Sequence, residues 1–232
     1  MNCIAALKTQ RLFAASVVLT ACCLFAVPLQ ADNVINTING AAGFAILGGP
    51  PDARRTLEAA WNQTSAFSNV GVAAMIDPGE SETESHSFSG TAFLMNQIGP
   101  GTTVANEIGH SPFTVTGTAF NPTLVTLFTG LTLPSGTYYL ILTAAVGQTG
   151  GWENADVPTL VVAAPGVTLV EQKGLGGEPA YPPTAIFHHL GGNALEFQVT
   201  GNAVASEPGA LVLAAFGVLP FVGIIRARLR RR

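Results

Sequence analysis

The sequence predicts an all-β protein, a two-sheet, jelly-roll-like sandwich placed between two apolar terminal segments. Three observations predict this arrangement. Between residues 32 and 201 the chain consists of short β-rich runs separated by Gly, Pro, Asn and Ser. These runs lack the sustained 3.6-residue periodicity of apolar residues that indicates amphipathic helices. Each end of the chain, by contrast, has an uncharged apolar stretch next to basic residues.

The N-terminal segment has the order of a secretory signal peptide. A lysine and an arginine precede an apolar run from Leu12 to Val27, and Leu29-Gln30-Ala31 then offers a small residue at the cut. We therefore expect residues 1–31 to be removed by cleavage after Ala31. The four residues that end at Cys22 also resemble the lipobox of bacterial lipoproteins, in which Cys22 would be lipidated. Against this alternative, Cys22 is followed by more apolar residues where a polar tether is usual.

The region between the terminal segments is acidic. Residues 32–206 hold three Lys or Arg against thirteen Asp or Glu, a formal charge of −10. This charge disfavours nucleic acid and anionic lipid, because phosphate contacts require clustered basic side chains, and it permits cations and neutral glycans. All three cysteines lie in the expected signal peptide, so the exported chain would have no disulfide and would depend on an ordinary hydrophobic core.

Nine runs of the middle region are strand candidates, a number typical of a sandwich. In chain order they are Leu57–Gln63, Val70–Ile76, Ser87–Met95, Phe113–Ala119, Thr123–Phe128, Thr137–Ala144, Thr159–Val162, Val167–Val170 and Ala194–Thr200.

Three local patterns make the strand prediction more specific. Apolar and polar residues alternate from Leu195 to Val199, which predicts one face in the core and the other, with Glu196, in water. Leu133-Pro134-Ser135-Gly136 has Pro and Gly where a type I turn prefers them, so it should join two antiparallel strands. The following run from Tyr138 to Leu142 is continuously apolar, which predicts a central strand covered on both faces.

The C-terminal segment has the properties of a membrane span. The 17 uncharged residues from Gly209 to Ile225 lie at the short end of the ~17 to 25 that cross a bilayer. Placing Arg at the bilayer centre costs roughly 2.5 to 3.5 kcal/mol per residue, so the basic residues that follow should stay on the cytoplasmic side. They are Arg226, Arg228, Arg230, Arg231 and Arg232. A buried core helix is the alternative, although core helices rarely end a chain in five arginines.

The signal peptide, the external region and this tail together resemble the PEP-CTERM proteins, which are exported by Gram-negative bacteria. The tail, residues 202–232, contains Ala205-Ser206-Glu207-Pro208, where the fuller form in the family is Val-Pro-Glu-Pro. The resemblance implies that Glu207 and Pro208 belong to a sorting signal, which an integral-membrane transpeptidase called an exosortase recognises and cuts. It also implies an inner-membrane stage, then a place at the cell surface or in the extracellular matrix, with extracellular polysaccharide and biofilm.

The resemblance extends more loosely through the middle region. PEP-CTERM ectodomains have a tryptophan strand and then a Val/Ala strand, here Trp61 and Asn69–Ala74. They also have a Leu-Pro-x-Gly-x-Tyr-Tyr-Leu element, here Leu133 to Leu140, and a Gly-Trp element, here Gly151-Trp152. A closing Phe-x-Val-x-Gly corresponds to Phe197–Gly201. Such elements are typical of a fold and leave the ligand open.

Motifs of catalysis are missing from the middle region of the sequence. It contains no Gly-x-Ser-x-Gly elbow, His-Glu-x-x-His helix, Walker loop or Cys-x-x-Cys pair. We therefore expect a protein that is not an enzyme and has no cofactor. The glycines from Gly174 to Gly177 are interpreted as a surface loop. A glycoside hydrolase with two carboxylates, such as Glu153 and Glu196, is a further reading that no spacing or motif supports.

Three sets of polar residues are candidates for binding. Asp77, Glu80, Glu82 and Glu84 offer oxygen ligands for a cation such as calcium, but they match no calcium-loop pattern, and a solvated loop is the better interpretation. His188 and His189 are adjacent, so in a strand they would point to opposite faces and could not readily chelate one ion. We therefore expect no metal.

The third set is Trp152 with Asn154 in an expected loop, where an aromatic face and a planar amide could contact a glycan. Packing of Trp152 in the core or loop is the favoured interpretation. Two functions of different class follow from the whole sequence. The first is a non-enzymatic surface or matrix protein sorted through its tail, and the alternative is a glycan-binding sandwich with Trp152 or Trp61 at its site.

Overall fold

The computed structural model describes residues 32–40, 43–49, 55–79, 81–155, 162–176, 188–189 and 194–204. The expected signal peptide and the sorting tail, with its apolar segment 209–225, lie outside these residues. Within them no helix is long and apolar enough to cross a membrane. What they form is a set of antiparallel strands and one short 3₁₀ helix.

The elements are, in chain order, β1 (Asp32–Asn36), β2 (Gly43–Gly48), β3 (Arg55–Gln63), β4 (Phe67–Asp77), β5 (His86–Met95), η1 (Val104–Asn106), β6 (Glu107–Gly117), β7 (Thr123–Leu133), β8 (Gly136–Ala144), β9 (Thr149–Ala155), β10 (Val162–Ala163), β11 (Val167–Gly176), β12 (His188–His189), β13 (Ala194–Leu195) and β14 (Phe197–Ala203).

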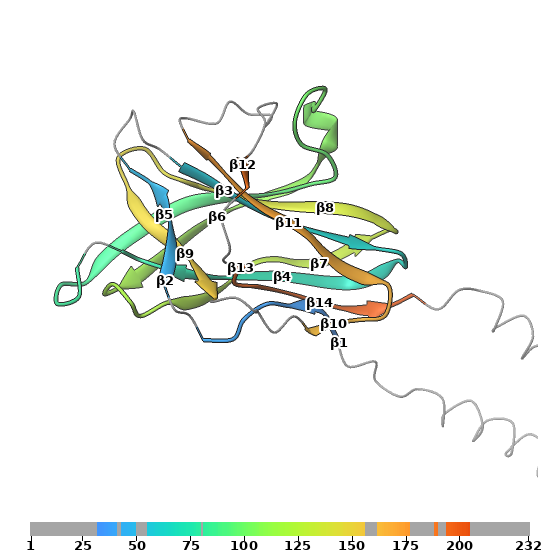
Figure 1. The fold of residues 1–232 in the computed structure, drawn as a ribbon, viewed down its shortest axis with the longest axis horizontal. Helices are drawn as coiled ribbons and strands as arrows, with labels where there is room; N and C mark the ends of the chain where they lie inside the picture. The colour runs from blue at the N-terminus through green and yellow to red at the C-terminus, as the bar shows by residue number, and fades with distance from the viewer. Residues whose placement is uncertain are drawn as a thin grey trace, which may run out of the picture. The chain divides into compact units, whose positions relative to one another are not determined.

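The strands form two antiparallel layers, as Figure 1 shows. One layer has the order β11-β3-β8-β5-β6 and the other has the order β7-β4-β14-β1-β10. Strands β9 and β2 connect the layers at one end, because β9 pairs with β4 and with β2, and β2 reaches β3 through one residue pair. The expected all-β, two-sheet sandwich is confirmed.

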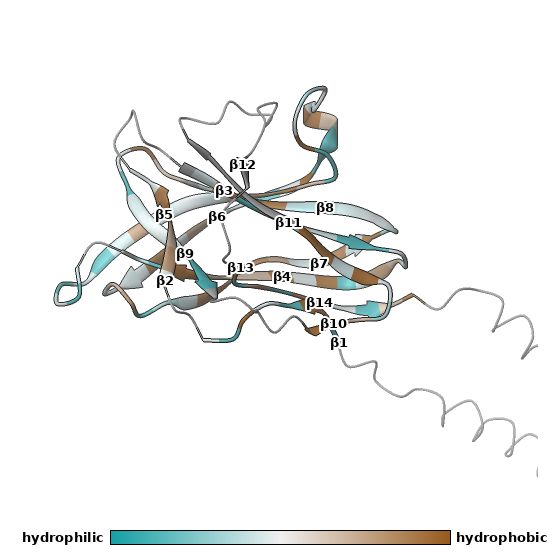
Figure 2. Cartoon of the chain, viewed as in Figure 1, coloured by the Kyte–Doolittle hydropathy of each residue, from teal (hydrophilic) through white to brown (hydrophobic). Residues whose placement is uncertain are grey.

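The hydrophobic core fills the space between the layers. Trp61, Trp152, Phe88 and Phe197 are its largest fully buried side chains. The ring centroid of Trp61 lies 5.6 Å from that of Tyr138 and 5.9 Å from that of Phe197, so one aromatic group joins both layers. Hydrophobic residues occur on strands of both layers in Figure 2. Burial of each such side chain stabilises the fold by roughly 1.5 to 3 kcal/mol.

Most strand predictions agree with the structure. Eight of the nine predicted runs overlap observed strands, and of the remaining one, Thr159–Val162, only Val162 is described, as the first residue of β10. The apolar run after the turn is confirmed as a central strand, since β8 lies between β3 and β5. Leu140, Ile141 and Leu142 are all buried, although their side chains alternate between the two faces of the sheet.

Two glycine-rich segments predicted as loops are strands in the structure. Strand β9 contains Gly150 and Gly151, and a Cβ on either residue would clash with the ring of Phe88 or Phe44. These glycines allow aromatic rings to lie against the strand backbone, so they mark close packing and not a turn. Strand β11 likewise continues through Gly176, paired with β3, where the sequence predicted a surface loop from Gly174 to Gly177.

Candidate functional site

Both tryptophans are core residues. Trp152 lies in β9, is fully buried, and donates a hydrogen bond from Nε1 to the carbonyl of Glu196 at 2.8 Å. Trp61 is equally buried and donates from Nε1 to Oε1 of Gln63 at 3.2 Å. The prediction of a loop around Trp152 is therefore wrong, whereas the interpretation of the Trp152 ring as a packing residue fits the structure. Asn154, two residues farther along β9, is half-buried.

The acidic loop does not gather its carboxylates. Asp77 ends β4 and is fully buried, with Oδ1 accepting a hydrogen bond from the Gly79 backbone at 2.6 Å. Glu82 and Glu84 are exposed to solvent, and Glu80 lies outside the described residues. The side chains of His188 and His189, in β12, also lie outside the description. In the described part of the chain, no three His, Cys, Asp or Glu residues are placed to hold a metal ion.

Three carboxylates instead meet inside one end of the sandwich, and we call Asp77, Glu153 and Glu196 the carboxylate cluster. Asp77 and Glu196 have no exposed surface, and Glu153 is 2% exposed. The pairing of the strands brings them together, because Asp77 lies opposite Gly151 on β9, two residues from Glu153. Glu196 donates its backbone N–H to the Glu153 carbonyl at 2.8 Å.

The position of Glu196 explains why the alternation rule fails there. Glu196 lies between β13 and β14, at the point where β9 replaces β14 as the neighbour of β4. Its carbonyl accepts hydrogen bonds from Met75 N at 3.0 Å and from Trp152 Nε1 at 2.8 Å. The backbone kink turns this residue inward, so the prediction that Glu196 faces water is wrong. Gln198, the next polar residue along, is partly exposed as predicted.

Within the cluster, Glu153 keeps its proton to a higher pH than an ordinary glutamate does. Burial raises the pKa of Glu153 to about 7, and the charges of Asp77 and Glu196 and a hydrogen bond with Asp77 act in the same direction. One oxygen of Glu196 accepts from Asn39 N at 3.1 Å. The second oxygens, Asp77 Oδ2 and Glu196 Oε2, are buried and meet no fixed donor in the described residues. A protonated Glu153 is thus well placed to donate to Asp77 and to relieve the repulsion.

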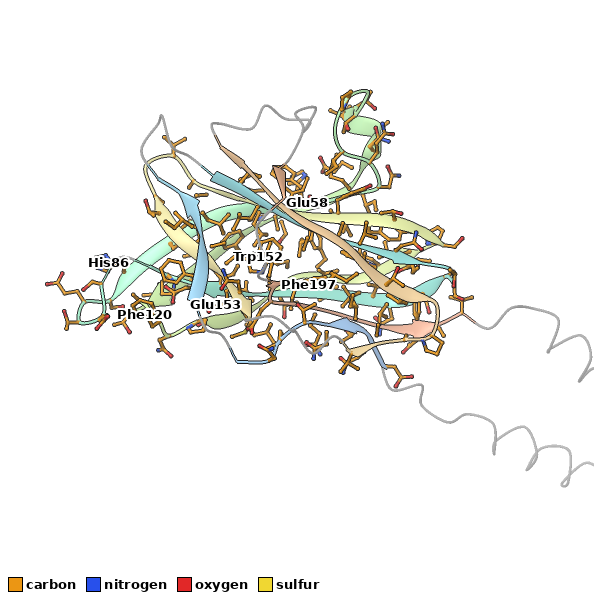
Figure 3. All side chains as sticks on the ribbon, viewed as in Figure 1. Glu58, His86, Phe120, Trp152, Glu153 and Phe197 are labelled. Atoms are coloured by element: carbon orange, nitrogen blue, oxygen red, sulfur yellow. The ribbon has the colours of Figure 1, made fainter. Side chains whose placement is uncertain are left out.

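An aromatic pair lies beside the cluster. Phe44 is the cross-strand neighbour of Glu153, and its ring lies on the backbone of Gly151. The ring of Phe120 lies 5.7 Å from that of Phe44, and Phe120 is 64% exposed with a φ of 59°. Glu153 and Phe120 lie toward the same end of the sandwich in Figure 3. The carboxylates themselves are closed to solvent, so the arrangement can bind a proton but presents no catalytic acid to a substrate.

The sequence contained a partial signal for this cluster. Each carboxylate directly follows a buried apolar residue, namely Ile76, Trp152 and Leu195. The hydrolase reading had paired Glu153 with Glu196, which the structure does bring together, whereas Asp77 had been assigned to the solvated loop. No protein-family model matches the chain, and no curated protein matches it. Fold and site therefore define it by themselves as a β-sandwich protein with a buried carboxylate cluster.

Proposed function

We propose that this chain is an exported, non-enzymatic protein of the cell surface or extracellular matrix. A signal peptide carries it across the inner membrane, and an exosortase-type transpeptidase sorts and cuts it at the tail that contains Glu207 and Pro208. Its domain then has a jelly-roll-like sandwich fold and associates with extracellular polysaccharide. The proposal rests on the sequence resemblance and on one structural observation, the position of the strand boundaries.

The first and last large strands fit between the two expected cuts. The described part of β1 starts at Asp32, on the C-terminal side of the expected cleavage site, and β14 ends at Ala203, before Glu207. Asp32 and Gly201 are paired in neighbouring antiparallel strands, so the start of β1 lies beside the end of β14. Cleavage at both sites would leave every described strand and backbone pair in place. This compatibility supports processing at both ends.

The test compares cell fractions and intact masses of the wild-type protein and of Glu207→Ala. We expect the wild type outside the inner membrane, with its N-terminus at Asp32 and its apolar tail removed. Glu207→Ala should accumulate at full tail length in the inner membrane. Glu82→Ala, which changes an exposed acidic residue of the sandwich, is the matched control and should be sorted normally. An uncut wild-type tail, with no effect of Glu207→Ala, would mean that the segment is only an anchor.

A glycan-binding module is the second candidate function. The buried tryptophans cannot provide its site, because neither ring has exposed surface. The observation that favours this candidate is an uncharged groove between β7, β8 and the loop after β5, which includes Asn96 and the turn residues 132–138.

A further inference from the structure

We infer that the groove at the β7–β8 turn is a binding site for a neutral sugar unit of a polysaccharide. The inference rests on the proposed association with extracellular polysaccharide and names the part of the domain responsible for it. The groove is formed by residues 132–138, Asn96 and Ile108, and has a volume of about 380 Å³. Small-molecule sites range from about 300 to 1,000 Å³, so this groove suits about one or two sugar rings.

The lining of the groove selects for an uncharged ligand. None of its residues carries a charge, so an anionic sugar or a phosphate would find no cation, and a metal ion would find no carboxylate. The half-buried Ile108 and the exposed Pro134 give it apolar surface for the C–H groups of a sugar. Hydroxyls of Thr132, Ser135 and Thr137 and the amide of Asn96 give it polar groups for sugar hydroxyls.

Several polar groups of the groove are already oriented by hydrogen bonds. Asn62 Nδ2 donates to Thr137 Oγ1 at 2.9 Å, which leaves the Thr137 O–H as a donor for another group. Asn106 Nδ2 donates to Asn96 Oδ1 at 3.0 Å, so the Asn96 N–H groups remain for other acceptors. Tyr138 Oη donates to the Pro134 carbonyl at 2.6 Å and keeps a lone pair to accept. Orientation before binding lowers the ordering cost of association.

The turn itself is held from the core. Gln63 is 1% exposed, and its Nε2 donates to the carbonyls of Leu133 at 3.0 Å and Pro134 at 2.9 Å. Its Oε1 accepts a hydrogen bond from Trp61 Nε1, so Trp61 orients the Gln63 amide and this amide in turn holds the turn carbonyls. Strands β7 and β8 lie in different layers and do not pair with each other, so no ladder between them holds this turn. The buried amide gives this turn a defined backbone on which the hydroxyls of the groove are placed.

The groove lies far from the carboxylate cluster and near the exit of the chain. Leu133 pairs with Phe67 at the start of β4, whereas Asp77 ends the same strand ten residues later, about 33 Å away at the rise of a strand. Ala203 pairs with the same Phe67, and Val204 donates to the carbonyl of Ala66. A polysaccharide in the groove would therefore lie at the end of the sandwich from which the sorting tail leaves.

The test uses the mature protein purified from producing cells, screened on an array of neutral and anionic oligosaccharides and then titrated by calorimetry with the best neutral one. We expect binding of neutral glycans that is insensitive to salt, because no charged group lines the groove. Thr132→Trp fills the groove and should weaken this binding at least tenfold. Thr126→Trp places the same side chain on an exposed site of β7 outside the groove and should leave affinity within twofold.

Asn96→Ala is the second variant and should weaken binding about five- to tenfold with an unchanged melting temperature, because its side chain is exposed. Binding of neutral glycans that survives both Thr132→Trp and Asn96→Ala, binding of anionic glycans alone, or no binding at all would each overturn the inference. The proposed export is judged separately by fractionation and mass. A correctly exported and cut protein that binds no neutral glycan contradicts this inference and leaves the proposed sorting intact.

Discussion

Replacement of Glu153 by Gln should remove a large part of the pH dependence of the free energy of unfolding. The pKa of Glu153 is about 7 in the folded protein, against an ordinary value of 4.5 that applies to the unfolded chain. Between these two values the folded state binds more protons than the unfolded state. The free energy of unfolding of the wild type should therefore fall as the pH rises from about 4.5 to 7, and then level off.

The magnitude follows from the size of the shift. One pKa unit corresponds to 1.36 kcal/mol, so the difference between 4.5 and about 7 sets a ceiling of about 3 kcal/mol. The effective dielectric constant of protein sites is higher than that of a dry interior, which reduces this, and we expect a loss of about 1 to 2 kcal/mol. Glu153→Gln is a direct comparison, because the glutamine amide can donate an N–H to Asp77 at every pH. The Glu153 carboxyl can donate to Asp77 only while it is protonated. Glu153→Gln should match the wild type near pH 5 and exceed its stability by about 1 to 2 kcal/mol at pH 8.

The assay is urea unfolding followed by tryptophan fluorescence at pH 5, 6, 7 and 8, because both buried tryptophans change environment on unfolding. Glu82→Gln is the matched control, since it neutralises an exposed carboxylate and should keep the wild-type slope. Other titrating groups are common to all three proteins and cancel in the comparison. A Glu153→Gln slope equal to that of the wild type between pH 5 and 8 would refute the reasoning.

Two further substitutions test the packing that positions these sites. Gly151→Ala should destabilise the fold by about 1 to 3 kcal/mol, because its Cβ would meet the Phe44 ring, whereas Gly43→Ala, on the paired strand, meets only Asn154 Oδ1 at 3.6 Å and should change little. Thermal melts that show equal stability for both would contradict the assignment of β9 as a tightly packed strand. Gln63→Leu should cost about 1 to 3 kcal/mol, because the Leu133 carbonyl and the Trp61 N–H lose the hydrogen bonds from Gln63 and the Pro134 carbonyl keeps only the one from Tyr138, and it should also weaken glycan binding. Gln198→Leu, where the amide makes an exposed bond to Asn33, is the control and should cost less than about 0.5 kcal/mol in urea unfolding.

The sequence predicted strands whose own residues show an apolar or alternating pattern. It missed strands whose residues are explained only by packing against other strands. Strand β8 was predictable because its continuous apolar run indicates a covered central strand and a Pro-x-Gly turn precedes it. Strand β9 was not predictable from Thr149 to Ala155 alone, because its two glycines are explained only by the aromatic rings of β2 and β5. Glu196 was misplaced for a similar reason. The alternation rule assumes a continuous strand, and the change of partner at this residue breaks it.

In and beside the turn element from Leu133 to Leu140, the residues that the fold requires differ from those that a ligand could contact. Leu133, Tyr138 and Leu140 are buried, Pro134 accepts hydrogen bonds from Gln63 and Tyr138, and Gly136 completes the turn, so packing and backbone geometry account for each of them. Ser135 and the flanking Thr132 are exposed and bear no core contact that constrains them. Related sandwiches could therefore keep the buried residues and change the exposed ones. Substitution at Thr132 or Ser135 should alter which glycan binds while leaving the melting temperature unchanged, which is the behaviour of a recognition surface supported by an independent core.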